Sequence, residues 1–471
     1  MPLFSSSHLN LIGESACCRR MHVKKASGFP GHQTGIMPAG GGVLQLVATG
    51  KEDIFLIGNP QKTFFKKVYQ RHTNFAIESM PMYFDGTANF GQRVTCVVPR
   101  QGDLLSRVYI DVTLPRLTLN DASATPVSYV NAIGHALIQE VSFEIGEQEI
   151  DRQTGEWMEI WTQFATSASQ RDALNAMIGR VDGFAFPDFI PGPAADGLHL
   201  HIPLQFFFCQ DDGLSLPLLA LQYHPVRINL KIAPLQSLFW TPDLLADSSG
   251  CLQVQQANIL NMQLWGDYVY LDVEERRRFV AQPQEYLIQQ VQYTPSVGIP
   301  ASQTTATIQA DFNHPVREFF FVMQRDYMKQ VHEPFNYSSL AVGEAVPASL
   351  VPYFLPGQIR TDLISDAVLQ LNGYDRFQRR NAFHFRIVQP YKYHTTTPVN
   401  SYIYNYCFAE DPEDLAPSGS LNTTRIDTVV WQMTLNALLA GVRGNCSTRI
   451  YATNHNVLRV VDGYGGVMFT I

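Results

Sequence analysis

Two histidines spaced two residues apart are the first candidates for chemistry. His199 and His201, in the segment HLHIP, would point to the same face of a strand, because side chains alternate along a strand. Metal sites of the cupin type add a glutamate a few residues after such a pair. Here Pro203, Leu204 and Gln205 follow, so this segment offers no third ligand. We interpret the two histidines as structural and predict no metal site.

Three closely spaced carboxylates are the next candidates. Glu147, Glu149 and Asp151, in GEQEIDR, fall on one face of a strand. Glycoside hydrolysis uses one carboxylate as a nucleophile and another as an acid. A solvated hairpin edge after Gly146 explains the same pattern, since charges at an edge oppose strand pairing between molecules. We adopt this second interpretation.

Motifs for other catalytic classes are missing from the sequence. It contains no GxSxG nucleophile turn, no GxGxxG and no GxxxxGK[ST] phosphate loop. We therefore predict no catalytic residue and no cofactor. The seven cysteines are scattered without a CxxC pair, which is typical of free thiols in a reducing compartment.

Three Asn-x-Ser/Thr sequons begin at Asn336, Asn422 and Asn445. The sequence shows no secretory signal peptide, so we interpret them as chance matches rather than glycosylation sites. No stretch approaches the roughly 20 apolar residues that span a bilayer.

A basic and aromatic segment, GNPQKTFFKKVYQRHTNF, occupies residues 58–75. Its cations and rings alternate at Lys62, Phe64, Phe65, Lys66, Lys67, Tyr69 and Arg71. Stacking rings beside cations are a feature of nucleic-acid binding.

The same segment also fits a short helix. Asn59 is a suitable N-cap, and proline at position 60 suits the first helical turn. Val68, His72 and Phe75 would then share one apolar face with Phe65, and the lysines would lie on the other side. Periodicity explains the rings without stacking on bases, so we predict an amphipathic helix and no sequence-specific nucleic-acid binding.

Composition and length describe an acidic chain with a basic start. The 471 residues carry a formal net charge of −8, with 45% hydrophobic and only 16% charged residues. This charged share is below the usual value of about 25%, which suggests that partner subunits cover much of the surface. Residues 1–75 carry nine Lys/Arg and three Asp/Glu, a net of +6, which predicts an anionic partner for this part. For the first 36 residues a transit peptide, a flexible extension and an upstream start codon remain open, and we favour the last two.

The rest of the chain predicts many short strands and few helices. The chain is too long for one ordinary core, so we expect two domains. Alternating or continuous apolar runs separated by Gly, Pro, Ser and Thr are typical of sandwiches and jelly rolls. We predict strands at residues 93–98, 103–114, 141–146, 199–208, 226–232, 262–271, 287–293, 317–323, 367–373, 402–408, 427–435 and 449–461. Further helices are predicted at residues 170–178 and 274–280.

An internal repeat supports two copies of one domain. LIQEVSFEIG at 137–146 is similar to LISDAVLQLN at 363–372, and an Asp-Arg pair follows each, at 151–152 and 375–376. The spacing is nearly half the chain. It predicts two related β-sandwiches joined near residues 272–286.

Six segments, in order, resemble major capsid proteins of the nucleocytoplasmic large DNA viruses. They are residues 37–79, 213–228, 267–292, 369–391, 417–427 and 451–466. The residues before Met37 depart from the family pattern.

The resemblance implies an all-β chain of two tandem eight-stranded jelly-roll β-sandwiches, a double jelly roll, with few short helices. The expected division is an N-terminal extension (1–36), a basic and aromatic arm with a short helix at the capsomer base (37–75), a first jelly roll (76–272), a linker (273–285) and a second jelly roll (286–471). Loops 167–198, 234–256, 379–400 and 438–449 would face outward.

The implied function is structural rather than enzymatic. Three subunits would form a pseudo-hexagonal capsomer that tiles an icosahedral virion shell, assembled in the host cytoplasm. Partners would be the homotrimer, neighbouring capsomers, and minor capsid and penton proteins. The arm would face inward, toward minor proteins or an internal viral membrane. An enzyme or a glycan-binding protein on a tandem, bicupin-like scaffold remains the alternative.

Overall fold

The computed structural model describes residues 41–117, 127–181, 197–241, 244, 255–344, 360–439 and 443–470. The chain divides into two compact units, of which the first ends at Arg71 and the second begins at His72. The predicted extension 1–36, parts of the predicted outer loops, and Cys17, Cys18 and Cys251 lie outside the described residues.

From residue 41 onward, the first unit holds two short helices, α1 (Gly41–Val47) and α2 (Ile54–Ile57). The helix predicted from Asn59 onward is wrong, since the residues between α2 and the end of this unit form neither helix nor strand. Asn59 has a φ of 52°, a left-handed conformation that is common just after a helix and not within one. Short helices need a packing partner, and within this unit the rings of Phe64 and Phe65 are exposed.

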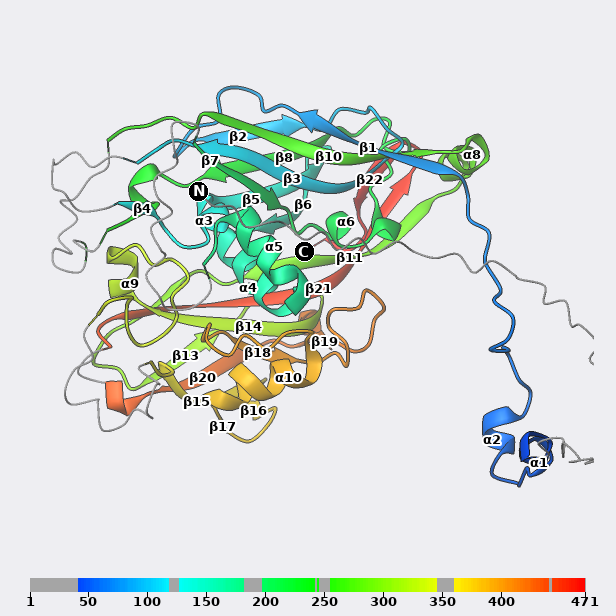
Figure 1. The fold of residues 1–471 in the computed structure, drawn as a ribbon. Helices are drawn as coiled ribbons and strands as arrows, with labels where there is room; N and C mark the ends of the chain where they lie inside the picture. Colours follow the sequence, from blue (N-terminus) through cyan, green and yellow to red (C-terminus); the bar gives the residue numbers. More distant parts are fainter. Residues whose placement is uncertain are drawn as a thin grey trace, which may run out of the picture. The chain divides into compact units, whose positions relative to one another are not determined.

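The second unit begins with a sandwich of two four-stranded antiparallel sheets, coloured blue to green in Figure 1. The first sheet runs β1 (Phe75–Met82), β10 (Asn261–Leu271), β3 (Leu104–Leu114) and β7 (Leu198–Pro203). The second sheet runs β2 (Arg93–Val97), β8 (Val226–Ile232), β5 (Ile138–Ile145) and β6 (Gln148–Gln153). The short pair β4 (Ser128–Tyr129) and β9 (Phe239–Trp240) lies outside these sheets.

A second sandwich follows. Its first sheet runs β11 (Gln284–Tyr293), β21 (Cys446–Val461), β14 (Pro315–Arg325) and β18 (Tyr404–Cys407), with β12 (Val297–Ile299), β19 (Leu421–Asn422) and β22 (Tyr464–Val467) paired at its sides. Its second sheet runs β13 (Thr305–Gln309), β20 (Val429–Leu435), β15 (Ile364–Leu371) and β16 (Tyr374–Asp375), with β17 (Arg380–Asn381) beside β15.

Both sandwiches have the same topology. Counted along the chain, the eight main strands of each are ordered 1-8-3-6 in one sheet and 2-7-4-5 in the other, which is the arrangement of a jelly roll. The internal repeat falls on equivalent strands, β5 and β15. Both strands carry a register shift at the same place, between Ile138 and Glu140 in β5 and between Ile364 and Asp366 in β15. The two jelly rolls therefore share their strand order and also the position of this register shift.

The helices of the second unit are short, with at most 11 residues in those described. Within the described ranges of this unit, the α-helices with assigned bounds are α3 (Ile133–Leu137), α4 (Gly155–Ala165), α5 (Ala168–Ile178), α6 (Phe207–Gln210), α8 (Val273–Ala281), α9 (Asp326–Gln330) and α10 (Gln389–Tyr393). The same ranges also hold the helical turns η1 (Asp212–Leu214), η2 (Leu235–Ser237), η4 (His384–Val388), η5 (Thr423–Arg425) and η6 (Ala437–Leu439). α5 and α8 agree with the predicted helices, whereas η4 and α10 occupy a segment predicted to be an outer loop.

One predicted strand ends early. The strand expected at 199–208 stops at Pro203, and α6 follows. Phe206, Phe207 and Phe208 are all buried to 1% exposure or less. Alternation along a strand would turn the middle ring toward solvent, so a helical turn is required to bury all three.

Candidate functional site

The junction between the two jelly rolls is built around α4, which in Figure 1 lies between the two sandwiches. Trp157, Ile160, Trp161 and Phe164 follow helical spacing and are buried in one apolar cluster with residues of β14 and β21. Phe320 of β14 is at the centre, with its ring centroid 5.4 Å from that of Trp157 and 5.0 Å from that of Phe164. This helix was not predicted from the sequence, although the spacing of its large apolar residues indicates one helical face.

A polar cluster joins the rolls beside these rings. The carboxylate of Glu156 in α4 accepts hydrogen bonds from Tyr451 at 2.7 Å, from Tyr337 at 3.1 Å and from Arg449. Burial, followed by the nearby Glu156 charge, raises the pKa of Tyr451 well above its usual value. The phenol of Tyr451 therefore stays protonated and donates a hydrogen bond. These hydrogen bonds connect α4 of the first roll to β21 of the second.

The predicted carboxylate cluster is divided by the fold. Glu147 and Glu149 are exposed, and Glu149 pairs with Arg152 at 2.8 Å, as expected for a hairpin edge. For Asp151 the prediction of a solvated edge is wrong. This residue is buried, and its carboxylate accepts a hydrogen bond of 3.1 Å from the backbone N–H of Val291 in β11. A register shift within the hairpin breaks the simple alternation of faces.

Burial makes Asp151 unusual. It raises the pKa of this carboxyl from 3.8 to about 7, against the opposing effect of its hydrogen bonds. The group lies where the first roll contacts the second, which gives it a structural position rather than a place in a substrate cleft.

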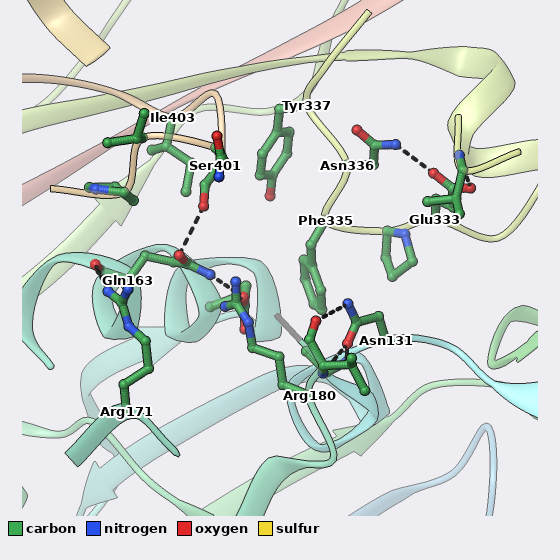
Figure 2. Close-up of a pocket in the computed structure, with 18 of the residues that line it drawn as sticks. Asn131, Gln163, Arg171, Arg180, Glu333, Phe335, Asn336, Tyr337, Ser401 and Ile403 are labelled. Atoms are coloured by element: carbon green, nitrogen blue, oxygen red, sulfur yellow. Dashed lines mark hydrogen bonds and ion pairs between the residues drawn. The ribbon is translucent and has the colours of Figure 1, made fainter. Parts of the chain in front are cut away.

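A cavity of about 400 Å³ opens at the same junction, between α4, α5 and segments of the second roll (Figure 2). Ser401 donates a hydrogen bond of 2.9 Å to Gln163 across it. His332, also on its wall, contacts the carbonyl oxygen of Phe239 at 2.8 Å through Nδ1. These serine and histidine groups are each committed to structural partners, so they do not form a nucleophile and base pair here.

A second buried cluster lies within the second roll. His394 Nε2 is 3.0 Å from Glu318 Oε2, and its Nδ1 is 2.9 Å from Glu413 Oε1. Burial lowers the pKa of His394, but the two carboxylates outweigh this effect and raise it to about 9. Cys407 Sγ also lies 3.6 Å from Glu318 Oε2. Both ring nitrogens are occupied by carboxylates, so the arrangement is a buried ion pair that joins loop to sheet.

The two histidines of the HLHIP segment lie on β7, and both face outward while Leu200 and Ile202 enter the core. A carboxylate from outside this segment lies beside them. Asp111, on the neighbouring strand β3, places Oδ1 3.3 Å from His199 Nε2 and 3.8 Å from His201 Nδ1. Antiparallel pairing brings this carboxylate from a distant part of the chain.

The basic and aromatic residues of the arm lie in the first unit. Within that unit all seven are exposed: Lys62, Phe64, Phe65, Lys66, Lys67, Tyr69 and Arg71. Two cations lie near rings, with Lys62 Nζ 5.0 Å from the Phe64 centroid and Lys67 Nζ 5.5 Å from the Tyr69 centroid.

The three sequons have different surroundings. The amide of Asn336 is half-buried and donates to the carbonyl of Leu340 at 3.1 Å, and the hydroxyl-bearing Ser338 of that sequon is fully buried. Asn422 and Asn445 are exposed. Folding thus disfavours modification at the first of these sites.

Cys96, Cys209, Cys407 and Cys446, the described cysteines, are free thiols. Among the described residues, the helices are all too short or too polar to cross a membrane.

Comparisons with known proteins agree across both jelly rolls. The family model described as "Major capsid protein N-terminus" matches residues 63–272, and that of the "Large eukaryotic DNA virus major capsid protein" matches residues 275–466. The chain is 37% identical to the major capsid protein of Pyramimonas orientalis virus, covering 92% of this chain and 100% of that one. It is 35% identical to that of Phaeocystis pouchetii virus, covering 91% and 99%.

A solved structure supports the same conclusion. PBCV-1 VP54, whose crystal structure was fitted into a reconstruction of the virophage Sputnik, is similar with a TM-score of 0.68 and 30% identity, covering 87% of this chain and 100% of that chain. With its two jelly rolls of matching topology, this chain belongs to the family of large eukaryotic DNA virus major capsid proteins.

Proposed function

We propose that this chain builds the icosahedral shell of a large DNA virus as a homotrimer, in which each subunit contributes two jelly rolls to a pseudo-hexagonal capsomer. The observation that carries the proposal is the repeated strand order, 1-8-3-6 and 2-7-4-5, in both rolls. Three copies of such a chain supply six similar sandwiches around one axis. The buried junction at α4 supports it further, because a rigid pair of rolls keeps the outline constant from one subunit to the next.

The proposal also assigns a role to each part of the chain. Residues 76–272 and 286–471 would form the two wall-building rolls, with 273–285 as the linker between them. Trimer contacts on the order of 2,000 Å² or more are expected for an obligate assembly. Neighbouring capsomers and minor capsid and penton proteins would bind through smaller, more polar surfaces. Free thiols are consistent with assembly in the host cytoplasm before the shell is complete.

The mass in solution tests the trimer. Size-exclusion chromatography with light scattering should give three times the chain mass of 52.9 kDa, and negative-stain images should show a pseudo-hexagonal outline. A chain that stays monomeric across concentration contradicts the proposal and reopens the enzyme and glycan-binding alternatives.

We further propose that the arm binds an anionic surface inside the shell, such as an internal membrane. Its support is the exposed set of cations and rings in the first unit. Sedimentation with vesicles containing phosphatidylserine should be strong for the wild-type chain and weak for the variant Lys62→Glu, Lys66→Glu and Lys67→Glu. A matched control reverses Arg277, Arg278 and Lys392, which lie in the second unit. Equal binding by all three proteins contradicts this role of the arm.

A further inference from the structure

We propose that Asp111, His199 and His201 form a binding site for a divalent transition metal ion on the outer face of the first jelly roll, with Zn²⁺ as the representative ion. The inference concerns a site on the sandwich surface and does not depend on the capsomer proposal. Its support comes from geometry, from a buried carboxylate oxygen that accepts no hydrogen bond, and from the chemistry of the three side chains.

The strand pairing places the ligands together. β3 and β7 are antiparallel neighbours, with Asp111 opposite His201 and Thr113 opposite His199, so the carboxylate lies beside both imidazoles. One ligand atom from each residue lies within 4.8 Å of the other two. In a tetrahedral zinc site with bonds of about 2.0–2.1 Å, ligand atoms are about 3.4 Å apart. Small side-chain rotations therefore reach coordination geometry, with no change of the backbone.

The carboxylate is incompletely satisfied. Asp111 is only 8% exposed, and its Oδ1 accepts no hydrogen bond although the atom is buried. Its other oxygen, Oδ2, accepts from Gln263 Nε2 of β10 at 3.4 Å, which turns Oδ1 toward the two histidines. Its nearest polar neighbours are the two imidazoles, at 3.3 and 3.8 Å, and a cation between the three side chains would bond to this oxygen directly. Gln263 would then act as the outer partner that orients a metal ligand.

The ligand types select the class of ion. Two imidazoles and one carboxylate suit Zn²⁺, Co²⁺ and similar ions, whereas Mg²⁺ and Ca²⁺ prefer oxygen ligands alone. The side chains of His199 and His201 are 53% and 46% exposed, so an ion can enter from solution. Three protein ligands leave at least one coordination position open toward solvent.

Cobalt spectroscopy on the full-length protein tests the site. After dialysis against EDTA, titration with Co²⁺ should produce visible d–d absorption for one ion per chain, without the thiolate charge-transfer band that cysteine ligands would add. Zn²⁺ should displace the cobalt. Zn²⁺ should also raise the melting temperature of the wild-type protein, because an ion that binds only the folded state stabilises it.

Matched variants decide the assignment. Asp111→Asn should weaken cobalt binding by about tenfold or more, and the double variant His199→Ala and His201→Ala should abolish it. Asp267→Asn, which removes another carboxylate from β10 of the same sheet, should bind like the wild type. Because both histidines are half exposed, the double variant should keep the wild-type melting temperature in EDTA. The proposal is overturned if the double variant binds cobalt as the wild type does, if a thiolate band appears, or if the wild-type protein binds none.

Discussion

The phenol of Tyr451 donates a hydrogen bond of 2.7 Å to the carboxylate of Glu156, across 295 residues of sequence. Glu156 belongs to α4, which follows the last strand of the second sheet in the first jelly roll, and Tyr451 belongs to β21, at the centre of the second roll's first sheet. In the whole chain Tyr451 is buried and Glu156 is partly buried. The contact therefore ties the stability of each roll to the presence of the other.

We predict that Tyr451→Phe lowers the free energy of unfolding by about 1 kcal/mol, the usual net value of one hydrogen bond. Glu156→Gln should cost more, about 2 kcal/mol, since it leaves the partly buried Arg449 cation without its counter-ion. Urea denaturation of the purified protein measures both. Tyr374→Phe, at an exposed position, is the control and should change little. Equal stability of all three variants would contradict the role assigned to the cluster.

The apolar side of the junction predicts a larger effect. Phe320→Ala removes a fully buried ring that packs on three aromatic rings of α4, so we expect a loss of about 3–5 kcal/mol. Phe383→Ala deletes a ring that is 53% exposed and should cost far less. Denaturant midpoints compare the two variants. A similar small loss in both would show that the rolls do not depend on α4 for their contact.

His394 predicts a dependence of stability on pH. Its pKa rises from 6.5 to about 9 on folding because two carboxylates outweigh burial. A basic group with a raised pKa stabilises the fold fully below its unfolded pKa. That contribution is lost as the pH rises from about 6.5 through about 9.

Melting temperatures of the wild type and of His394→Gln, recorded from neutral to alkaline pH, measure this contribution. The wild type should melt at a higher temperature than His394→Gln at neutral pH, and this difference in melting temperature should shrink as the pH rises to about 9. An advantage that stays constant with pH would show that His394 is not protonated in the folded protein.

Asp151 also makes stability depend on pH, and here the group is an acid that is neutral when protonated. Its pKa rises from 3.8 to about 7 on folding because the carboxyl is buried, so the folded state binds the proton more tightly. Its contribution to stability is therefore present at acid pH and declines as the pH rises from about 3.8 through about 7. Asp151→Asn keeps an acceptor for the Val291 backbone but cannot ionise.

The variant should gain stability relative to the wild type as the pH rises through this range. Thermal melts in matched buffers on either side of the interval give the result, and Glu149→Gln, at the exposed neighbour, provides the control. If both variants differ from the wild type by the same amount at every pH, Asp151 ionises normally.

Much of the fold could be predicted from the sequence because strands leave a local signal. The run VVWQMTL at 429–435 alternates buried and partly buried residues along β20, as its pattern of large apolar side chains indicates. The repeat at 137–146 and 363–372 identified two equivalent strands before any pairing was known. α4 could have been found in the same way, since Trp157, Ile160, Trp161 and Phe164 are spaced as one helical face.

Other features depend on contacts between distant parts of the chain. The apolar spacing after Asn59 suggested a helix, but in the first unit those rings have no surface to pack against. The sequence around Asp151 predicts a solvated charge at a hairpin edge, but in the structure β11 of the second roll packs against this carboxyl and buries it. The sequence by itself determined a chain of tandem β-sandwiches, because alternation and repetition are properties of neighbouring residues. Only the tertiary structure decided that α4 joins the rolls and that Asp111 meets His199 and His201, because strand pairing and burial are set by residues far apart in the chain.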